Sequence, residues 1–117
     1  MIQTITRDQL KTALDEGREV ILVESLSPQS YEKGHLPGAI NVPRERVREL
    51  APRLLPDKDA EIVVYCANTE CQSSLQTAQA LEGLGYTRVT DYEAGKQDWI
   101  EAGLPVETGA PAEVGRP

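Results

Sequence analysis

The sequence predicts an α/β domain whose strands form a mostly parallel sheet. Short apolar runs of strand length alternate with segments in which apolar residues recur at helical spacing. Such alternation is typical of βαβ units, whose crossover helices cover both faces of the sheet. At 117 residues, the chain has room for one domain with its own core. We expect this domain over residues 1–106 and a flexible tail, rich in Gly, Pro, Ala and Glu, over 107–117.

The first half of the chain supplies two helices and two strands. Thr6 and Gln9 have the spacing of a capping box, and Gly17 marks the end of the helix that they open. Ser27 followed by Pro28 is a typical start for a second, shorter helix. The predicted elements are a helix at 7–16, a strand at 20–23, a short helix at 28–34, a turn-rich loop at 34–38 and a strand at 39–42.

The second half repeats this alternation. Pro52 lacks a backbone N–H and is expected to interrupt a helical segment. Leu75, Ala78 and Leu81 are predicted to share the inner face of a later helix. The predicted elements are an interrupted helix at 44–55, a strand at 61–65, a helix at 74–84, a strand at 88–92 and a helix at 96–102.

Cys66 directly follows the apolar strand at 61–65 and precedes a polar loop that leads into a helix. In parallel sheets, functional sites lie beyond the carboxyl ends of the strands. Loop amides and the positive end of the next helix stabilise a thiolate, so we expect Cys66 to have a lowered pKa and to act as a nucleophile. The alternative is a small, inert residue buried at a strand end.

Composition excludes several classes of function. A net charge of −7 disfavours nucleic acid as a partner, because phosphate contacts require a basic face. No apolar run approaches the ~18 residues needed to span a membrane, and the start of the chain has no signal-peptide pattern, so a cytoplasmic location without a membrane partner is expected. Two cysteines and one histidine fall short of the usual four zinc ligands, so no metal site is predicted.

The order of four motifs resembles the rhodanese family. They are Gly34-His35-Leu36-Pro37-Gly38-Ala39-Ile40-Asn41-Val42-Pro43, Val64-Tyr65-Cys66, Gly85-Tyr86, and Gly95-Lys96-Gln97-Asp98-Trp99 with Ala102-Gly103-Leu104-Pro105-Val106. The resemblance covers about residues 5–106 and implies a rhodanese fold, with a five-stranded sheet and helices on both faces. It also implies a sulfurtransferase in which Cys66 accepts a sulfane sulfur as a persulfide and passes it to a nucleophile.

The loop after Cys66 is the expected substrate site, because successive backbone amides can surround an anionic persulfide. Its residues are Ala67, Asn68, Thr69, Glu70, Cys71, Gln72 and Ser73. The chemistry requires neither a metal nor an organic cofactor. The expected partners are a small sulfur donor and a thiol or cyanide-like acceptor, with a sulfur-relay protein as a further option.

The chain departs from the family pattern in three places. Its loop is two residues longer, so Ser73 and Ser74 take the positions of the usual Arg-Ser pair. No Lys or Arg lies between Cys66 and Arg88, which predicts weak use of thiosulfate and argues against phosphatase activity. Residues 24–26, Glu-Ser-Leu, replace the common Asp-Val-Arg, so a usual ion pair is expected to be missing.

Several alternatives remain open. Cys71 is either a resolving thiol that attacks the Cys66 persulfide or a residue that packs inward. Two alternatives to a sulfurtransferase are a sulfur-carrier or binding module with little turnover and a thiol–disulfide redox protein that uses both cysteines. Structural roles are expected for His35 and Trp99, and solvated or capping roles for Asp91 and Asp98. Arg44, Arg46, Arg48 and Arg53 form either a mixed-charge helix face or a basic cluster leaning over the pocket.

Overall fold

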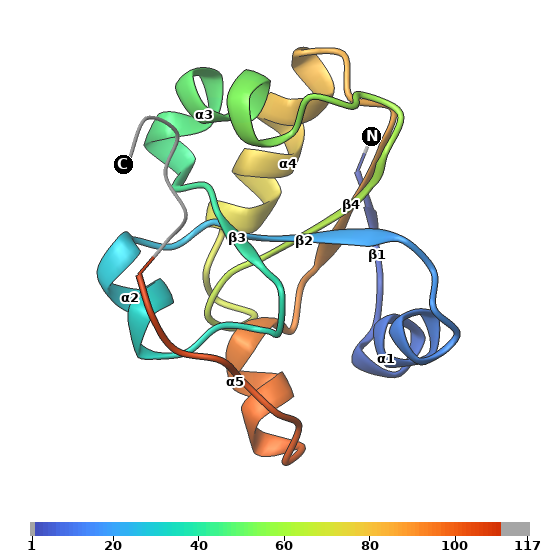
Figure 1. Cartoon of the computed structure of the whole chain (residues 1–117), viewed down its shortest axis with the longest axis vertical. Coiled ribbons are helices and arrows are strands. Elements are labelled where there is room, and N and C mark those ends of the chain that lie inside the picture. The colour runs from blue at the N-terminus through green and yellow to red at the C-terminus, as the bar shows by residue number, and fades with distance from the viewer. Residues whose placement is uncertain (1, 111–117) are drawn as a thin grey trace.

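A parallel sheet of five strands, in the order β1-β5-β4-β2-β3, forms the centre of the computed structural model, which describes residues 2–110 (Figure 1). The elements are, in chain order, β1 (Gln3–Thr4), α1 (Arg7–Asp15), β2 (Val20–Glu24), α2 (Pro28–Lys33), β3 (Ile40–Asn41), the 3-10 turn η1 (Arg44–Arg46), α3 (Val47–Leu54), β4 (Glu61–Tyr65), α4 (Ser73–Gly83), β5 (Arg88–Tyr92) and α5 (Gly95–Glu101). All strand pairs are parallel, which confirms the predicted α/β class.

The two faces of the sheet carry separate hydrophobic cores. Alternate residues of β4 point to opposite faces, so Ile62 and Val64 pack with α3 and α4, whereas Val63 and Tyr65 pack toward α1, α2 and α5. Figure 1 shows the same division, with α3 and α4 on one side of the strands and α1, α2 and α5 on the other. The central position of β4 places its carboxyl end between the two helical layers.

Most of the predicted boundaries lie within two residues of the observed ones, but two predictions about helices are wrong. Pro52 does not interrupt α3, which continues to Leu54, because the missing N–H removes one hydrogen bond in the last turns while Leu50 and Ala51 stay buried. Leu75 does not share the inner face of α4 and is 38% exposed. Ala78 and Leu81 are buried on the inner face as predicted, and Ser74 and Thr77 complete that face in place of Leu75.

Glu24 forms an ion pair with a residue that the sequence did not indicate, whereas Leu26 stands in place of the usual Arg. Glu24 is fully buried and accepts a hydrogen bond from the Lys96 ammonium at 3.2 Å and from the Tyr65 hydroxyl at 2.8 Å. Lys96 donates further to the carbonyls of Ser30 and Gly34. Through these hydrogen bonds, Lys96 connects α5 to β2, to α2 and to the loop after α2, and Tyr65 connects β4 to the same carboxylate.

The first residues of the predicted tail are attached to the domain. Glu107 and His35 exchange two backbone hydrogen bonds at 2.8 and 2.9 Å as an isolated antiparallel bridge. The Glu107 carboxylate also accepts from the Gly38 amide at 3.0 Å. The rest of the predicted tail, residues 111–117, lies outside the described residues. Within residues 2–110, no helix has the length and apolar character needed to cross a membrane.

Candidate active site

Cys66 lies at the carboxyl end of the central strand β4, facing the first turn of α4. Its side chain has no exposed surface. The thiol is directed at two oxygen atoms, the Cys71 carbonyl at 3.3 Å and the Ser74 hydroxyl at 3.5 Å. The predicted placement of the thiol, between a strand end and a helix amino terminus, is therefore what the fold produces.

The amino end of α5 fixes the start of the loop after Cys66. The backbone amide of Lys96 donates to the Cys66 carbonyl, and that of Gln97 donates to the Ala67 carbonyl, both at 2.8 Å. Gly95 permits this approach, because it has a φ of +76° and a Cβ there would lie 2.7 Å from the Cys66 oxygen. Since these carbonyls are held on the α5 side, the peptide planes at the start of the loop have a defined orientation.

A turn at Asn68 shapes the middle of the loop. The Asn68 side chain accepts from the Glu70 amide at 3.0 Å, and its backbone carbonyl accepts from the Cys71 amide at 3.1 Å. Glu70 itself is exposed. The amides of residues 70 and 71 are thus used within the loop, and the expectation that all amides of the loop point at the Cys66 sulfur is wrong in this reduced structure.

Two other loop amides, those of Ala67 and Ser73, act on Cys71, which is half-buried. Burial raises the pKa of Cys71, but hydrogen bonds from the Cys66 thiol and from the amides of Ala67 and Ser73 outweigh burial and lower that pKa overall. The two cysteines are therefore neighbours, since the Cys66 thiol also donates to the Cys71 carbonyl, and Cys71 lies on the more open side. Both are free cysteines.

The expected lowering of the Cys66 pKa is not found. Burial raises the pKa of the Cys66 thiol, and its hydrogen bond to Cys71 raises that pKa further. The hydroxyl and backbone amide of Ser74 act in the opposite direction but do not outweigh these effects. The helix amino terminus does contribute as expected, but removal of the thiol from water is the stronger effect.

Asp91 also differs from its prediction as a solvated or capping residue. It is 3% exposed, and burial raises the pKa of its carboxyl group above the usual range. The Ser74 side chain acts in the opposite direction and lowers this pKa in part, and the Ser74 hydroxyl accepts from the Cys66 thiol, so Ser74 neighbours both groups. No sequence motif identified this contact, because it depends on the register of two strands and the phase of one helix.

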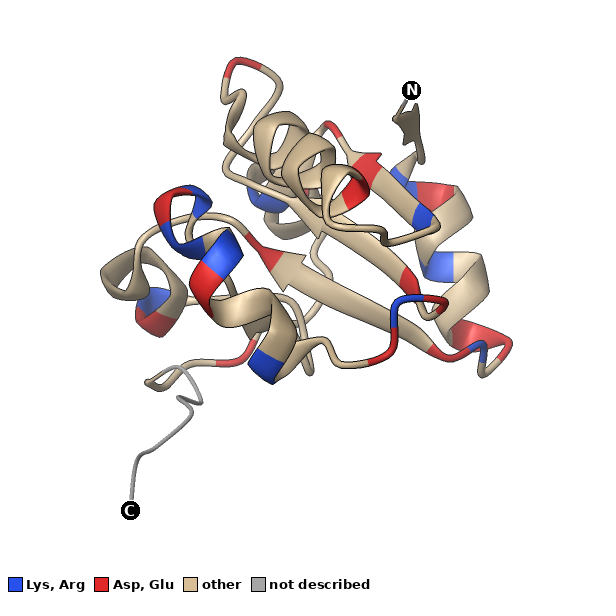
Figure 2. Cartoon of the chain, turned by 90° about the horizontal axis from the view of Figure 1, so that it is seen from above, with Lys and Arg blue, Asp and Glu red and all other residues tan. Residues whose placement is uncertain are grey.

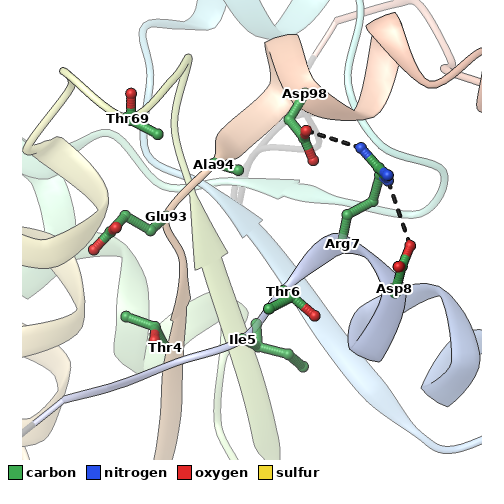
Figure 3. A pocket seen from close by; sticks show the side chains of 9 residues that line it. All are labelled: Thr4, Ile5, Thr6, Arg7, Asp8, Thr69, Glu93, Ala94 and Asp98. Carbon is green, nitrogen blue, oxygen red and sulfur yellow. Dashed lines mark hydrogen bonds and ion pairs between the residues drawn. The ribbon is translucent and has the colours of Figure 1, made fainter.

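A cavity of about 340 Å³ lies beside the loop and includes the loop residue Thr69 (Figure 3). Arg7 is the basic residue of its lining, and its guanidinium donates to Asp98 at 2.9 Å. Asp98 also accepts from the Tyr92 hydroxyl at 2.7 Å, so the prediction of a solvated or capping role for it is wrong. Neither cysteine lines this cavity.

Other residues considered from the sequence have structural contacts. The Nδ1 atom of His35 lies 2.8 Å from the Tyr31 carbonyl, and its ring stacks on the Tyr31 ring. Trp99 is 2% exposed and belongs to a hydrophobic core, as expected. Among the described residues, no group of three or more His, Cys, Asp and Glu residues has the geometry of a metal site.

The basic cluster is a mixed-charge surface at its centre, where Arg46 pairs with Glu49 at 2.9 Å. Figure 2 shows acidic and basic residues interspersed over the molecule. Arg44 is directed elsewhere and donates to the Gln76 side chain in the first half of α4 at 2.6 Å. It is therefore the member of the cluster that contacts the helix following the loop.

The fold and the thiol at the end of β4 define a class, and comparison with known sequences agrees with it. The sequence model of the Rhodanese-like domain matches residues 6–102, and the chain belongs to that family. The solved structure of a rhodanese-related protein from Thermoplasma volcanium is 26% identical, with a TM-score of 0.77 over 92% of this chain and 99% of that one. The rhodanese fold implied by the motifs is thus confirmed.

Two curated relatives carry different descriptions. The HTH-type transcriptional regulator Rv0324 of Mycobacterium tuberculosis is 38% identical over 112 residues, which are 95% of this chain and 47% of that protein. The thiosulfate sulfurtransferase PspE of Escherichia coli is 40% identical over 62 residues, which are 53% of this chain and 58% of that protein. The chain spans about half the length of each of these two relatives.

Proposed function

We propose that this domain is a sulfurtransferase in which Cys66 carries a sulfane sulfur as a persulfide and delivers it to a nucleophilic acceptor. The observation that carries the proposal is the position of the Cys66 thiol, at the end of the central strand and against Ser74 at the start of α4. Family membership and the similarity to a named sulfurtransferase support it.

The reaction divides into two displacements at sulfur. In the first, the Cys66 sulfur attacks the sulfane sulfur of the donor, the bond within the donor breaks, and the donor remnant leaves as an anion. In the second, the acceptor attacks the outer sulfur of the persulfide and releases the Cys66 thiolate. Neither step changes the number of electrons in the system, so no external oxidant or reductant is consumed.

Access to Cys66 requires a movement of the loop, because the thiol has no exposed surface and Cys71 lies next to it. The amides of Ala67 and Ser73, which now contact the Cys71 sulfur, are suitable donors for the outer sulfur of a persulfide once Cys71 moves aside. In this proposal the two free thiols belong to the resting form, and Cys71 moves aside to make room for the transferred sulfur.

The intact mass of the protein after incubation with polysulfide tests the proposal. We expect a gain of one sulfur atom that is reversed by a thiol or by cyanide. The gain should vanish in Cys66→Ser and persist in Cys71→Ser, which is the matched control because it removes the other thiol of the same loop. A gain that persists in Cys66→Ser and vanishes in Cys71→Ser would assign the carrier to the wrong cysteine and overturn the proposal.

Thiol–disulfide exchange is a second candidate function, favoured by the contact between the two cysteines. Oxidation of this pair would form a disulfide within the loop, without sulfur transfer. Titration of the protein against a glutathione redox buffer separates the two functions, because a reversible disulfide with no persulfide in the presence of polysulfide would support the redox function alone.

A further inference from the structure

Asp91 is a buried carboxyl group that reaches Cys66 through a single hydroxyl. β5 lies directly beside β4, with Asp91 opposite Val64, on the face of the sheet that α4 covers. Ser74, in the first turn of α4, is 2% exposed. Its hydroxyl accepts from the Cys66 thiol at 3.5 Å, and the Ser74 side chain is also the polar neighbour that lowers the pKa of the Asp91 carboxyl group. Ser74 is thus a polar neighbour of both Cys66 and Asp91 inside the domain.

Among residues 2–110, no Lys, Arg or His contributes to the pKa of the Asp91 carboxyl group. Its Oδ1 atom is buried and has no hydrogen-bond partner among the described residues. The titratable group that acts on it is Glu93, which follows the end of its own strand. α4 contributes the Ser74 hydroxyl, and β1, the other neighbouring strand, contains only the uncharged Gln3 and Thr4.

Such a carboxylate is poorly stabilised in its charged form and is therefore a better proton acceptor than an exposed one. Burial raises the Asp91 pKa most, Glu93 raises it further, and the Ser74 hydrogen bond lowers it only in part. Glu24, the other buried carboxylate described above, differs because it has Lys96 as a partner. A buried carboxylate oxygen without a hydrogen-bond partner lowers the stability of the folded state, so a role in the chemistry of the site would account for its presence.

We propose that Asp91 accepts the proton of Cys66 through the Ser74 hydroxyl as Cys66 takes up sulfur. The Cys66 proton moves to the Ser74 oxygen while the Ser74 proton moves to the Asp91 carboxylate, and the freed sulfur electron pair attacks the donor. After transfer, return of the proton along the same path restores the thiol. This inference rests on the proposed function. Asp91 acts on Cys66 through Ser74 and does not touch the substrate, so it is a positioning residue.

The relay meets two requirements of the site. Cys66 has a raised pKa and must lose its proton to react, and the single histidine of the chain is engaged with Tyr31 instead. Cys66, Ser74 and Asp91 all lie on or directly beside strands and helices rather than on residues 67–72. Opening of the loop to admit a donor therefore leaves the relay in place.

Simple electrostatics gives the opposite expectation, which makes the proposal testable. A negative Asp91 that acted only by its charge would repel the Cys66 thiolate, so its neutralisation would make Cys66 more reactive. A relay makes Cys66 less reactive on the same change, because an amide cannot accept the proton. The two readings differ in the sign of the effect of Asp91→Asn.

The experiment follows alkylation of Cys66 against pH in the full chain carrying Cys71→Ser, so that a single thiol is present. We expect Asp91→Asn and Ser74→Ala to slow alkylation at neutral pH by on the order of 10²-fold, the low end of the contribution of a positioned base. The rates of all variants should converge at high pH, where the thiol ionises without help. Glu93→Gln is the matched control, which removes a neighbouring carboxylate outside the relay and should leave the rate at neutral pH unreduced.

An unchanged or faster rate in Asp91→Asn at neutral pH would overturn the relay. Thermal unfolding of each variant separates this result from misfolding, and Asp91→Asn should be at least as stable as the parent because it removes a buried charge. The same samples are treated with polysulfide. A shifted pH profile without any persulfide would uphold the relay and reject the proposed function, whereas persulfide formation with superimposable pH profiles would do the reverse.

Discussion

Gly95 lies so close to Cys66 that a Cβ on Gly95 would be 2.7 Å from the Cys66 carbonyl oxygen. The same Cβ would lie 2.9 Å from backbone atoms of Ala67 and Asn68. All three contacts are with backbone, which cannot rotate away as a side chain can. The start of the loop after Cys66 therefore packs directly against the amino end of α5. The hydrogen bonds from the Lys96 and Gln97 amides to this loop depend on the glycine at position 95.

Gly95→Ala should therefore destabilise the domain and impair the site together. The substitution adds a positive-φ strain and a backbone clash, which together we place at about 2–4 kcal/mol. Urea unfolding followed by circular dichroism measures the loss. We also expect slower persulfide formation, because the carbonyls of Cys66 and Ala67 lose their partners.

Gly103→Ala is the matched control, because Gly103 has the same φ within one degree, +77°, and nothing within 4 Å of the added Cβ. It carries the strain without the contact and should cost about 1 kcal/mol, with no change in persulfide formation. If both variants lose the same free energy of unfolding, the close contact between Gly95 and the loop does not contribute to stability.

The buried pair of Glu24 and Lys96 predicts a pH-dependent loss of stability. Lys96→Met leaves the Glu24 carboxylate buried without a cation, so we expect a loss of about 3–5 kcal/mol at neutral pH. Burial raises the pKa of Glu24, and Lys96 opposes that rise, so the variant raises the pKa further. The folded state then binds a proton that the unfolded state does not, and stability increases as pH falls through the raised pKa toward the ordinary one.

The deficit of Lys96→Met relative to the parent should accordingly shrink between neutral and mildly acidic pH in urea unfolding. Lys11→Met is the control, since Lys11 pairs with Asp15 on the exposed surface of α1 and should change stability by about 0.5 kcal/mol or less. A deficit that is independent of pH would mean that Glu24 is already protonated at neutral pH.

The agreement between sequence and structure is best where the signal is local. The capping box of Thr6 and Gln9 and the strand at 61–65 follow from adjacent residues, and both are present as predicted. The Lys96 contact to Glu24, the close approach of Gly95 and the burial of Asp91 each join residues from separate elements. Such contacts depend on strand register and helix packing, and the incorrect placement of Leu75 on the inner face of α4 left the buried Ser74 unnoticed.

Donor preference should reflect the lack of a cation in the loop. Thiosulfate should be a poor donor and polysulfide a better one, because Glu70 is the only charged residue between Cys66 and the start of α4. Glu70→Arg should lower the KM for thiosulfate roughly tenfold, the equivalent of a charge-assisted hydrogen bond of about 1.5 kcal/mol. Steady-state kinetics with cyanide as acceptor measures this effect.

Glu16→Arg is the control for Glu70→Arg, since it makes the same change of charge at an exposed position at the end of α1. If both variants lower the KM equally, the effect is one of net charge. If Glu70→Arg leaves the KM unchanged, a cation from outside the loop already serves the donor, and Arg44, which contacts α4, is the first residue to replace.

In the reduced protein, we expect the Cys71 thiol to react faster than the Cys66 thiol. The sequence alone predicts the opposite order. Cys71 is half-buried with a lowered pKa, whereas Cys66 is buried with a raised pKa. Alkylation at mildly acidic pH, followed by peptide mass mapping, should modify Cys71 first. Faster modification of Cys66 would mean that the loop is mainly open in solution.

The last prediction concerns the fate of the Cys66 persulfide. The Cys66 thiol lies against Cys71, and each thiol acts on the pKa of the other, so we expect Cys71 to be able to attack the inner sulfur of a persulfide on Cys66. That step forms a Cys66–Cys71 disulfide and releases the outer sulfur as hydrosulfide, with no other reactant. Polysulfide treatment of the parent should therefore yield, with time, a cross-linked peptide and a mass two protons below that of the reduced protein.

In Cys71→Ser, the persulfide should outlive that of the parent, because its intramolecular attacker is gone. Ser73→Ala is the matched control, since it alters the same loop and a contact of Cys71 but keeps both thiols. Its persulfide should decay by the same route as that of the parent, through the disulfide. An unchanged lifetime in Cys71→Ser, together with no cross-linked peptide in the parent, would limit Cys71 to covering Cys66 and would leave release of the sulfur to an external acceptor.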